Sequence, residues 1–208
     1  MNKILLACTI ILVFLSSASL FGEETLTVPR TENPPVIDGK INESTWADAL
    51  KFDNFKTIDP DYGKEPSQKT VAYMTYDSEN IYFAIRSFDT DPDKIKSSVS
   101  SRDGMFQDDY VAIMLDTFDT MQEAFGFFLN PLGIQGDGMV NADGNAEATF
   151  DMVWFSNGQI NEAFSLRFPI SGASNFQKQA LIISSRWIIS CPVSPQMIPA
   201  CRQQFEQV

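Results

Sequence analysis

Carboxylates are the most numerous side chains in this sequence that could do chemistry, and their spacing decides which chemistry that would be. Asp89, Asp91 and Asp93 alternate along a short segment, and hard oxygen ligands at alternate positions suit Ca²⁺. The segment does not follow the EF-hand pattern, because Lys94 stands where that loop requires glycine. Two interpretations therefore stay open: a structural calcium site, or aspartates that cap and turn the chain before Pro92.

Asp108 and Asp109 form the other pair of carboxylates whose position suggests chemistry. They are adjacent at the expected start of a strand, where successive side chains point to opposite faces. Glycoside hydrolysis needs two facing carboxylates about 5–10 Å apart, so this pair suits it poorly. The sequence has no histidine, which excludes Ser-His-Asp and Cys-His catalysis and histidine-bound zinc. We therefore assign no catalytic residue and expect a non-catalytic protein, and a glycosidase stays open as the alternative.

Runs of β-branched and aromatic residues separated by polar turns dominate the middle of the sequence. This pattern predicts an all-β fold, an antiparallel β-sandwich with one or two short helices. One helix is expected at residues 44–50 with Asn42 or Ser44 as its N-cap, and one helical turn at Pro92. The expected strands are residues 69–76, 81–88, 109–115, 123–129, 133–140 and 149–155.

Acidic residues outnumber basic ones by 27 to 15, which gives a net charge of −12 and a pI of about 4.3. Such a surface repels a phosphate backbone, so we expect no nucleic-acid partner. All but one of the acidic residues fall within residues 23–162. The uneven charge divides the sequence into three segments.

Residues 1–22 have the pattern of a secretory signal peptide. Lys3 precedes an apolar run over residues 4–15, and the small residues 16–19 follow. The run is shorter than the roughly 20 residues that a membrane-spanning helix needs. A lipoprotein signal around Cys8 and a buried N-terminal strand are the two alternatives. We expect an exported chain that resides in the periplasm, in the outer membrane or outside the cell.

Several motifs occur in an order that resembles a known family. They are PPVIDGKINESTW at 34–46, YDSENIYFAIRSFD at 76–89, DDYVAIMLDTF at 108–118, FFLNPLGIQGD at 127–137 and DMVW at 151–154. In this order they resemble the carbohydrate-binding module family 9-like sandwich. The most similar version stands at the N-terminus of large bacterial proteins with an outer-membrane-type C-terminal region. The resemblance covers about residues 33–162.

The expected domains are the sandwich at residues 23–162 and a divergent tail at residues 163–208. The tail contains no aspartate, and residues 165–169 come about ten residues earlier than the family pattern places them. Two interpretations of the tail stay open. It is either out-of-frame sequence that leaves the sandwich incomplete at its C-terminus, or a genuine divergent segment that completes the sandwich.

The resemblance implies a sugar site, of which this sequence keeps little. Sugar rings stack on aromatic side chains and accept hydrogen bonds from polar ones. The family's sugar-end binders clamp the ligand with two tryptophans, the first of which corresponds to Phe106. The family's glutamate and arginine correspond to Ala112 and Phe128. The candidate ligand-binding site is therefore Phe106 with Arg102 and Asp109 on one rim, and the alternative is that Phe106 is an ordinary rim or core aromatic.

Two functions of different classes follow from the resemblance. The first is non-catalytic recognition of a saccharide or polysaccharide, linked to carbohydrate breakdown, because the family's parent proteins are often associated with glycoside hydrolysis. The second is a periplasmic structural or interaction domain that packs on the outer-membrane region of its parent protein and binds no sugar. Structural calcium is the only cofactor that the resemblance implies.

Overall fold

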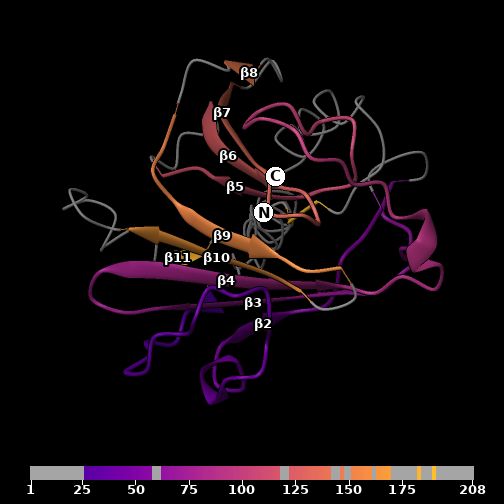
Figure 1. Ribbon diagram of the computed structural model, residues 1–208. Helices are drawn as coiled ribbons and strands as arrows, with labels where there is room; N and C mark the ends of the chain where they lie inside the picture. Colours follow the sequence, from indigo (N-terminus) through magenta and orange to yellow (C-terminus); the bar gives the residue numbers. More distant parts are fainter. Residues whose placement is uncertain are drawn as a thin grey trace, which may run out of the picture.

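Two antiparallel sheets face each other and enclose one hydrophobic core in the computed structural model (Figure 1). Among the described residues, two short 3-10 helices are the only helices, and the predicted all-β sandwich is confirmed. The structure describes residues 26–57, 62–117, 122–141, 146–147, 151–160, 163–169, 182–183 and 189–190. The expected signal peptide at residues 1–22 lies outside the described residues.

The first sheet has five strands in the order β2-β3-β4-β10-β9. Their bounds are β2 Leu50–Phe52, β3 Thr70–Tyr76, β4 Asn80–Ser87, β10 Phe164–Pro169 and β9 Phe155–Gly158. The turn between β3 and β4 is closed by Asp77, whose Oδ1 accepts hydrogen bonds from the backbone N–H groups of Glu79 and Asn80. This is the local bonding that favours aspartate in tight turns.

The second sheet also has five strands, in the order β12-β5-β6-β7-β8. Their bounds are β12 Ile189–Ser190, β5 Val111–Leu115, β6 Glu123–Leu129, β7 Gln135–Asn141 and β8 Ala146–Glu147. A separate pair joins β1 (Leu26–Thr27) to β11 (Ile182–Ile183). All pairings within the two sheets are antiparallel.

The core lies where alternate side chains of the two sheets meet. On β6, Phe127 is 1% exposed, and its ring centroid lies 4.5 Å from that of Phe168 on β10. The Trp154 ring completes this group at 5.5 Å from each of them. Since Phe127 belongs to one sheet and Phe168 to the other, these rings hold the layers together through the burial of a large apolar area.

The outer face of the first sheet is partly covered by the segment that precedes it. Trp46, in the 3-10 helix η1 (Ser44–Trp46), is 2% exposed and packs with Tyr82 and Ala84 of β4. Its indole Nε1 donates a hydrogen bond of 3.0 Å to Glu43 Oε2. The backbone N–H of Gly39 donates to Ser165 Oγ at 2.9 Å, which ties the same segment to β10.

The expected helix at residues 44–50 is wrong in its length and in its cap. It ends as η1 at Trp46, because Leu50 pairs with Met74 as the first residue of β2. The N-cap position is occupied by Glu43, without a capping hydrogen bond from its side chain, and not by Asn42 or Ser44. Long-range strand pairing therefore sets the boundary in place of local helix propensity.

The helical turn expected at Pro92 is present as η2 (Pro92–Lys94). The strand expected at residues 149–155 is wrong, because the described residues 151–154 pair with no strand and β9 begins at Phe155. The sheet continues beyond the expected domain boundary at residue 162. β10 occupies the place between β4 and β9, and its Leu166 is fully buried.

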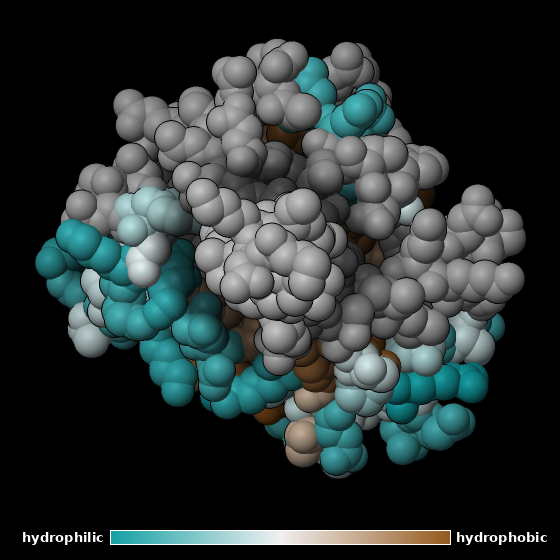
Figure 2. All heavy atoms as spheres, turned by 180° about the vertical axis from the view of Figure 1, so that it is seen from behind, coloured by the Kyte–Doolittle hydropathy of each residue, from teal (hydrophilic) through white to brown (hydrophobic). Residues whose placement is uncertain are grey.

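The described surface is mainly polar. Figure 2 shows hydrophilic residues over most of the described surface on this side of the molecule, with apolar residues in a narrow strip low in the view. Among the described residues, none forms a helix that is long and apolar enough to cross a membrane.

Candidate functional site

An aromatic cluster lies on the outer face of the second sheet. Val111 and Ile113 of β5 point into the core, so Tyr110 and the alternate residues point outwards. The Phe106 ring centroid lies 5.1 Å from that of Phe128 and 6.1 Å from that of Tyr110, and each ring meets the others nearly edge to face. Phe106 is 37% exposed, so its ring remains accessible to a ligand while the two neighbouring rings hold it in place.

Glycine beneath the cluster allows Phe106 to lie close to the sheet. A Cβ atom at Gly136 of β7 would lie 3.0 Å from Phe106 Cζ and 3.4 Å from Met105 Sδ. Met105 is fully buried, so the loop that carries Phe106 is anchored by its neighbour. The sheet surface and the buried methionine together fix the position of the exposed ring.

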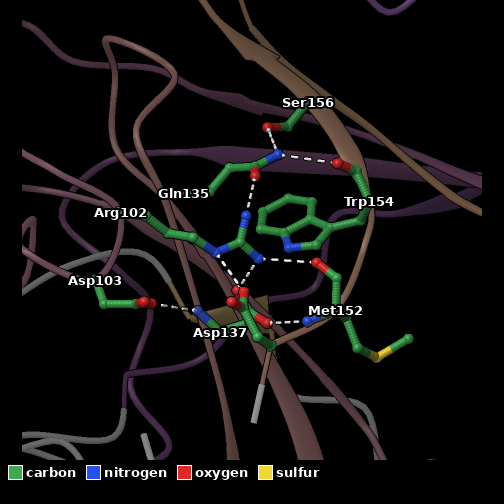
Figure 3. A network of polar contacts seen from close by, with 8 residues as sticks. Arg102, Asp103, Gln135, Asp137, Met152, Trp154 and Ser156 are labelled. Atoms are coloured by element: carbon green, nitrogen blue, oxygen red, sulfur yellow. Dashed lines mark hydrogen bonds and ion pairs between the residues drawn. The ribbon is translucent and has the colours of Figure 1, made fainter. Parts of the chain in front are cut away.

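The side chain of Arg102 is held in a network of polar contacts and does not lie free beside the aromatic cluster. Its Nη1 donates a hydrogen bond of 2.7 Å to Gln135 Oε1, and its Nη2 donates to Met152 O at 2.9 Å (Figure 3). The same Nη2 forms an ion pair with Asp137, whose side chain is 1% exposed. Arg102 Nε lies 3.0 Å from Asp151 Oδ1. The guanidinium group therefore neutralises a buried carboxylate and holds the backbone at Met152.

The network continues from Arg102 to the strands on both sides. Gln135 Nε2 donates to Trp154 O at 3.2 Å and to Ser156 Oγ at 2.8 Å. Asp137 Oδ2 accepts a hydrogen bond of 2.7 Å from the backbone N–H of Met152. Gln135 and Asp137 belong to β7 of the second sheet, whereas Ser156 belongs to β9 of the first. The network thus joins β7 of the second sheet to β9, the edge strand of the first (Figure 3).

Asp103 gives the loop its sharp bend. It is the non-glycine residue with a positive φ among those described, at 63°, a conformation that aspartate tolerates better than most residues. Its Oδ1 accepts a hydrogen bond of 3.0 Å from the backbone N–H of Asp137. The bend lets Arg102 point towards the network while Phe106 lies over the outer face of the sheet.

Asp108 and Asp109 both have structural partners, and they point to different surroundings, as the sequence predicts. The buried Asp108 accepts hydrogen bonds from Ser98 Oγ at 2.8 Å and from Asn130 Nδ2 at 2.9 Å. Asp109 Oδ2 accepts a hydrogen bond of 2.9 Å from the backbone N–H of Lys96. Asp109 therefore holds the segment before the aromatic loop in place, and its carboxylate has a partner within the protein.

Burial of the Asp108 carboxyl raises its pKa, but the hydrogen bonds from Asn130 and Ser98 together outweigh burial, so the pKa lies below its usual value. A depressed pKa stabilises the fold above the unfolded value of about 3.9, and this contribution disappears as the pH falls through the lower folded value. Asp108→Asn should therefore lower the free energy of unfolding by about 2 kcal/mol at pH 7.

The difference in the free energy of unfolding between the parent chain and Asp108→Asn should shrink as the pH is lowered from 5 to 2. Urea denaturation followed across this range measures it. Asp93→Asn, which alters an exposed carboxylate, serves as the control and should change the free energy of unfolding at pH 7 by less than about 0.5 kcal/mol. A difference that stays constant with pH would contradict the role given to the Asp108 charge.

The structure does not gather Asp89, Asp91 and Asp93 into a metal site. Asp89 Oδ1 accepts a hydrogen bond of 2.7 Å from the backbone N–H of Asp91, and Asp91 forms an ion pair with Lys94. Within the part of the chain that the structure describes, no three Asp, Glu, Cys or His side chains come close enough to hold a metal ion. The turn before Pro92 explains the aspartates, and the calcium interpretation of this segment is not supported.

Sequence reasoning identified the loop at Arg102 but not its partners. Gln135 and Asp137 carry the polar network and received no role from the sequence. The signal that could have found them is the run from Gln135 to Gly138, where polar side chains alternate with glycines in a strand between two apolar stretches. Polar residues at the inward positions of such a strand need buried partners.

Comparisons with known proteins bear on the fold. No protein-family model matches the chain, and no curated protein does either. Two solved structures are similar, both of a carbohydrate binding module family 9 from Caldicellulosiruptor kristjanssonii. The structure in complex with cellotriose has 17% identity and a TM-score of 0.46, over 69% of this chain and 67% of that one. The structure in complex with glucose has 18% identity and a TM-score of 0.47, over 70% and 69%.

Proposed function

We propose that this chain is a non-catalytic recognition domain that binds a saccharide on the outer face of its second sheet. The observation that carries the proposal is the exposed ring of Phe106, which Tyr110 and Phe128 hold in a fixed position. A rigid, accessible aromatic ring offers the C–H face of a sugar a surface whose ordering costs little on binding.

Polar groups for the sugar hydroxyls are available beside the ring. Asp103 and Gln107, on either side of Phe106 in the loop, are both exposed. Arg102 and Asp109 act as positioning residues in this proposal, because their charged groups already hold Asp137 and Lys96. This revises the ligand rim expected from the sequence while Phe106 keeps its expected role.

The test is a glycan array followed by titration calorimetry with the sugars that bind. Phe106→Ala should weaken binding by about 1–3 kcal/mol, the usual cost of a lost aromatic contact. Tyr62→Ala removes another exposed aromatic ring, 52% exposed, and serves as the matched control. Glucose and cellotriose belong in the panel because they are the ligands in the two similar structures. Equal affinity of the parent chain and Phe106→Ala would sink the assignment.

The proposal includes export and a role in carbohydrate breakdown as part of a larger envelope protein. The signal-peptide pattern of residues 1–22 supports export, and the family resemblance supports the other two points. Expression of the full sequence in a bacterium with an outer membrane, followed by mass spectrometry of the fractionated chain, tests whether residues near 1–22 are removed.

One observation favours an interaction domain as a second candidate. The positions that correspond to the family's sugar-binding glutamate and arginine hold Ala112, which is 1% exposed, and Phe128. Neither side chain can donate or accept a hydrogen bond. A folded chain that binds no sugar on the array, and whose Phe106→Ala variant loses binding to the outer-membrane region of a parent protein, would support this candidate.

A further inference from the structure

Arg167 lies on the outer face of the first sheet, on the opposite side of the sandwich from Phe106. Its strand, β10, runs between β4 and β9, and the neighbouring Leu166 and Phe168 point into the core. Arg167 therefore points outwards, between Tyr82 on β4 and Phe155 on β9, its two cross-strand neighbours. An arginine in the middle of a sheet has little freedom to move away from these neighbours.

The guanidinium group of Arg167 is packed but not paired. Its Cζ lies 4.1 Å from the centroid of the Phe155 ring, which is 45% exposed. Its Nε is buried and has no hydrogen-bond partner, and no ion pair joins Arg167 to any residue that the structure describes. A buried donor without an acceptor is rare in a folded protein and needs an explanation.

The carboxylate that contacts Tyr82, the cross-strand neighbour of Arg167, is already occupied. Asp77 lies at the turn before β4, and its Oδ2 accepts a hydrogen bond of 2.6 Å from the hydroxyl of Tyr82, the neighbour of Arg167. Its Oδ1 accepts two backbone hydrogen bonds from the turn. Within the part of the chain that the structure describes, this half-buried arginine thus forms no ion pair with an acidic residue.

We propose that Arg167 and Phe155 form a second binding site, for a saccharide that carries a carboxylate, such as a hexuronate. The Nε of Arg167 is buried, so the two terminal Nη groups of the stacked guanidinium would meet the carboxylate, with two parallel hydrogen bonds. The exposed part of the Phe155 ring offers a surface for the C–H groups of the sugar. The net charge of −12 opposes an anion at long range, so direct contact with Arg167 must carry the binding.

The test is titration calorimetry of the full chain with trigalacturonate, with its fully methyl-esterified form as the uncharged partner. The parent chain should bind trigalacturonate, and the ester should bind at least about tenfold more weakly because it lacks the charge-assisted hydrogen bonds. Arg167→Gln should lower the affinity for trigalacturonate by a similar factor, and Phe155→Ala should lower it several-fold. Arg30→Gln removes the same charge from an exposed arginine elsewhere and should leave the affinity unchanged.

Circular dichroism of each variant shows whether it is folded before its affinity is interpreted. Equal binding of trigalacturonate by the parent chain and a folded Arg167→Gln, or no binding by the parent chain, would overturn the proposal. Competition by sodium acetate at the same concentration as trigalacturonate would also overturn it, because a small carboxylate would then account for the whole affinity. Phe106→Ala, on the other face, should not alter trigalacturonate binding, so failure here and failure of the proposed function are distinguishable.

Discussion

Arg102→Ala is expected to lower the free energy of unfolding by about 3 kcal/mol, the scale on which a buried carboxylate that loses its partner destabilises a protein. The substitution leaves Asp137, whose side chain is 1% exposed, without its counter-charge. It also removes the donor to Met152 O, so the segment before β9 loses its link to the network. Denaturant unfolding followed by tryptophan fluorescence measures the change.

Two further variants separate the ion pair from the general loss of an arginine. Asp137→Asn combined with Arg102→Ala should cost less than the sum of the two single changes, because no buried charge remains unpaired. Arg30→Ala, at an exposed position, should change stability by less than about 0.5 kcal/mol. If the loss of unfolding free energy in the double variant equals the sum of the two single losses, Arg102 and Asp137 do not act together.

Phe127→Ala is expected to be the most destabilising single change in the core, at about 3–5 kcal/mol. Its ring contacts Trp154 and Phe168, so its removal opens a cavity between the two sheets at the point where they are held together. Since a domain of this size is stable by about 5–15 kcal/mol, much of the stability would be lost.

The measurement is the midpoint of urea unfolding together with its slope. Phe127→Leu keeps most of the apolar volume and should cost clearly less than the alanine variant. Leu132→Ala, at a side chain that is 43% exposed, is the surface control and should change stability by less than about 1 kcal/mol. An alanine variant at residue 127 that unfolds at the same urea concentration as the Leu132→Ala control would contradict the position given to this ring in the core.

The strands of the sandwich could be predicted because runs of β-branched and aromatic residues stand between polar turns. The ends of β3, β4 and β6 differ little from those expected, although β3 and β4 are buried on both faces over most of their length and do not alternate between core and surface. The strand expected at residues 149–155 is the informative failure. The apolar run before Phe155 has the composition of a strand, but the N–H of Met152 donates to Asp137 and its C=O accepts from Arg102. Side chains thus take the backbone groups that a neighbouring strand would otherwise use.

The candidate site could be predicted only in part, because its geometry depends on contacts between distant parts of the sequence. Phe106 is exposed at the expected place, beside the strand that Asp108 and Asp109 precede. The roles of Arg102 and Asp109 depend instead on which groups meet them in space. The partners of Arg102 lie 33 and 35 residues further along the chain, and the alternation of polar residues with glycines there does not show which residue they contact.

The position of β10 between β4 and β9 has a consequence for the order in which the chain acquires its structure. The β3–β4 hairpin can form as soon as residues 70–87 have been synthesised, since its contacts are local. The other edge of β4 must then wait for residues 164–169, and β9 pairs only with β10 within the sheet. Until residues 164–169 have been synthesised, β4 therefore presents an unpaired edge on which another nascent chain could add a strand. Because this sheet closes late, its rate of folding depends on a long-range encounter between β4 and β10. A high concentration of growing chains favours pairing between chains over that encounter.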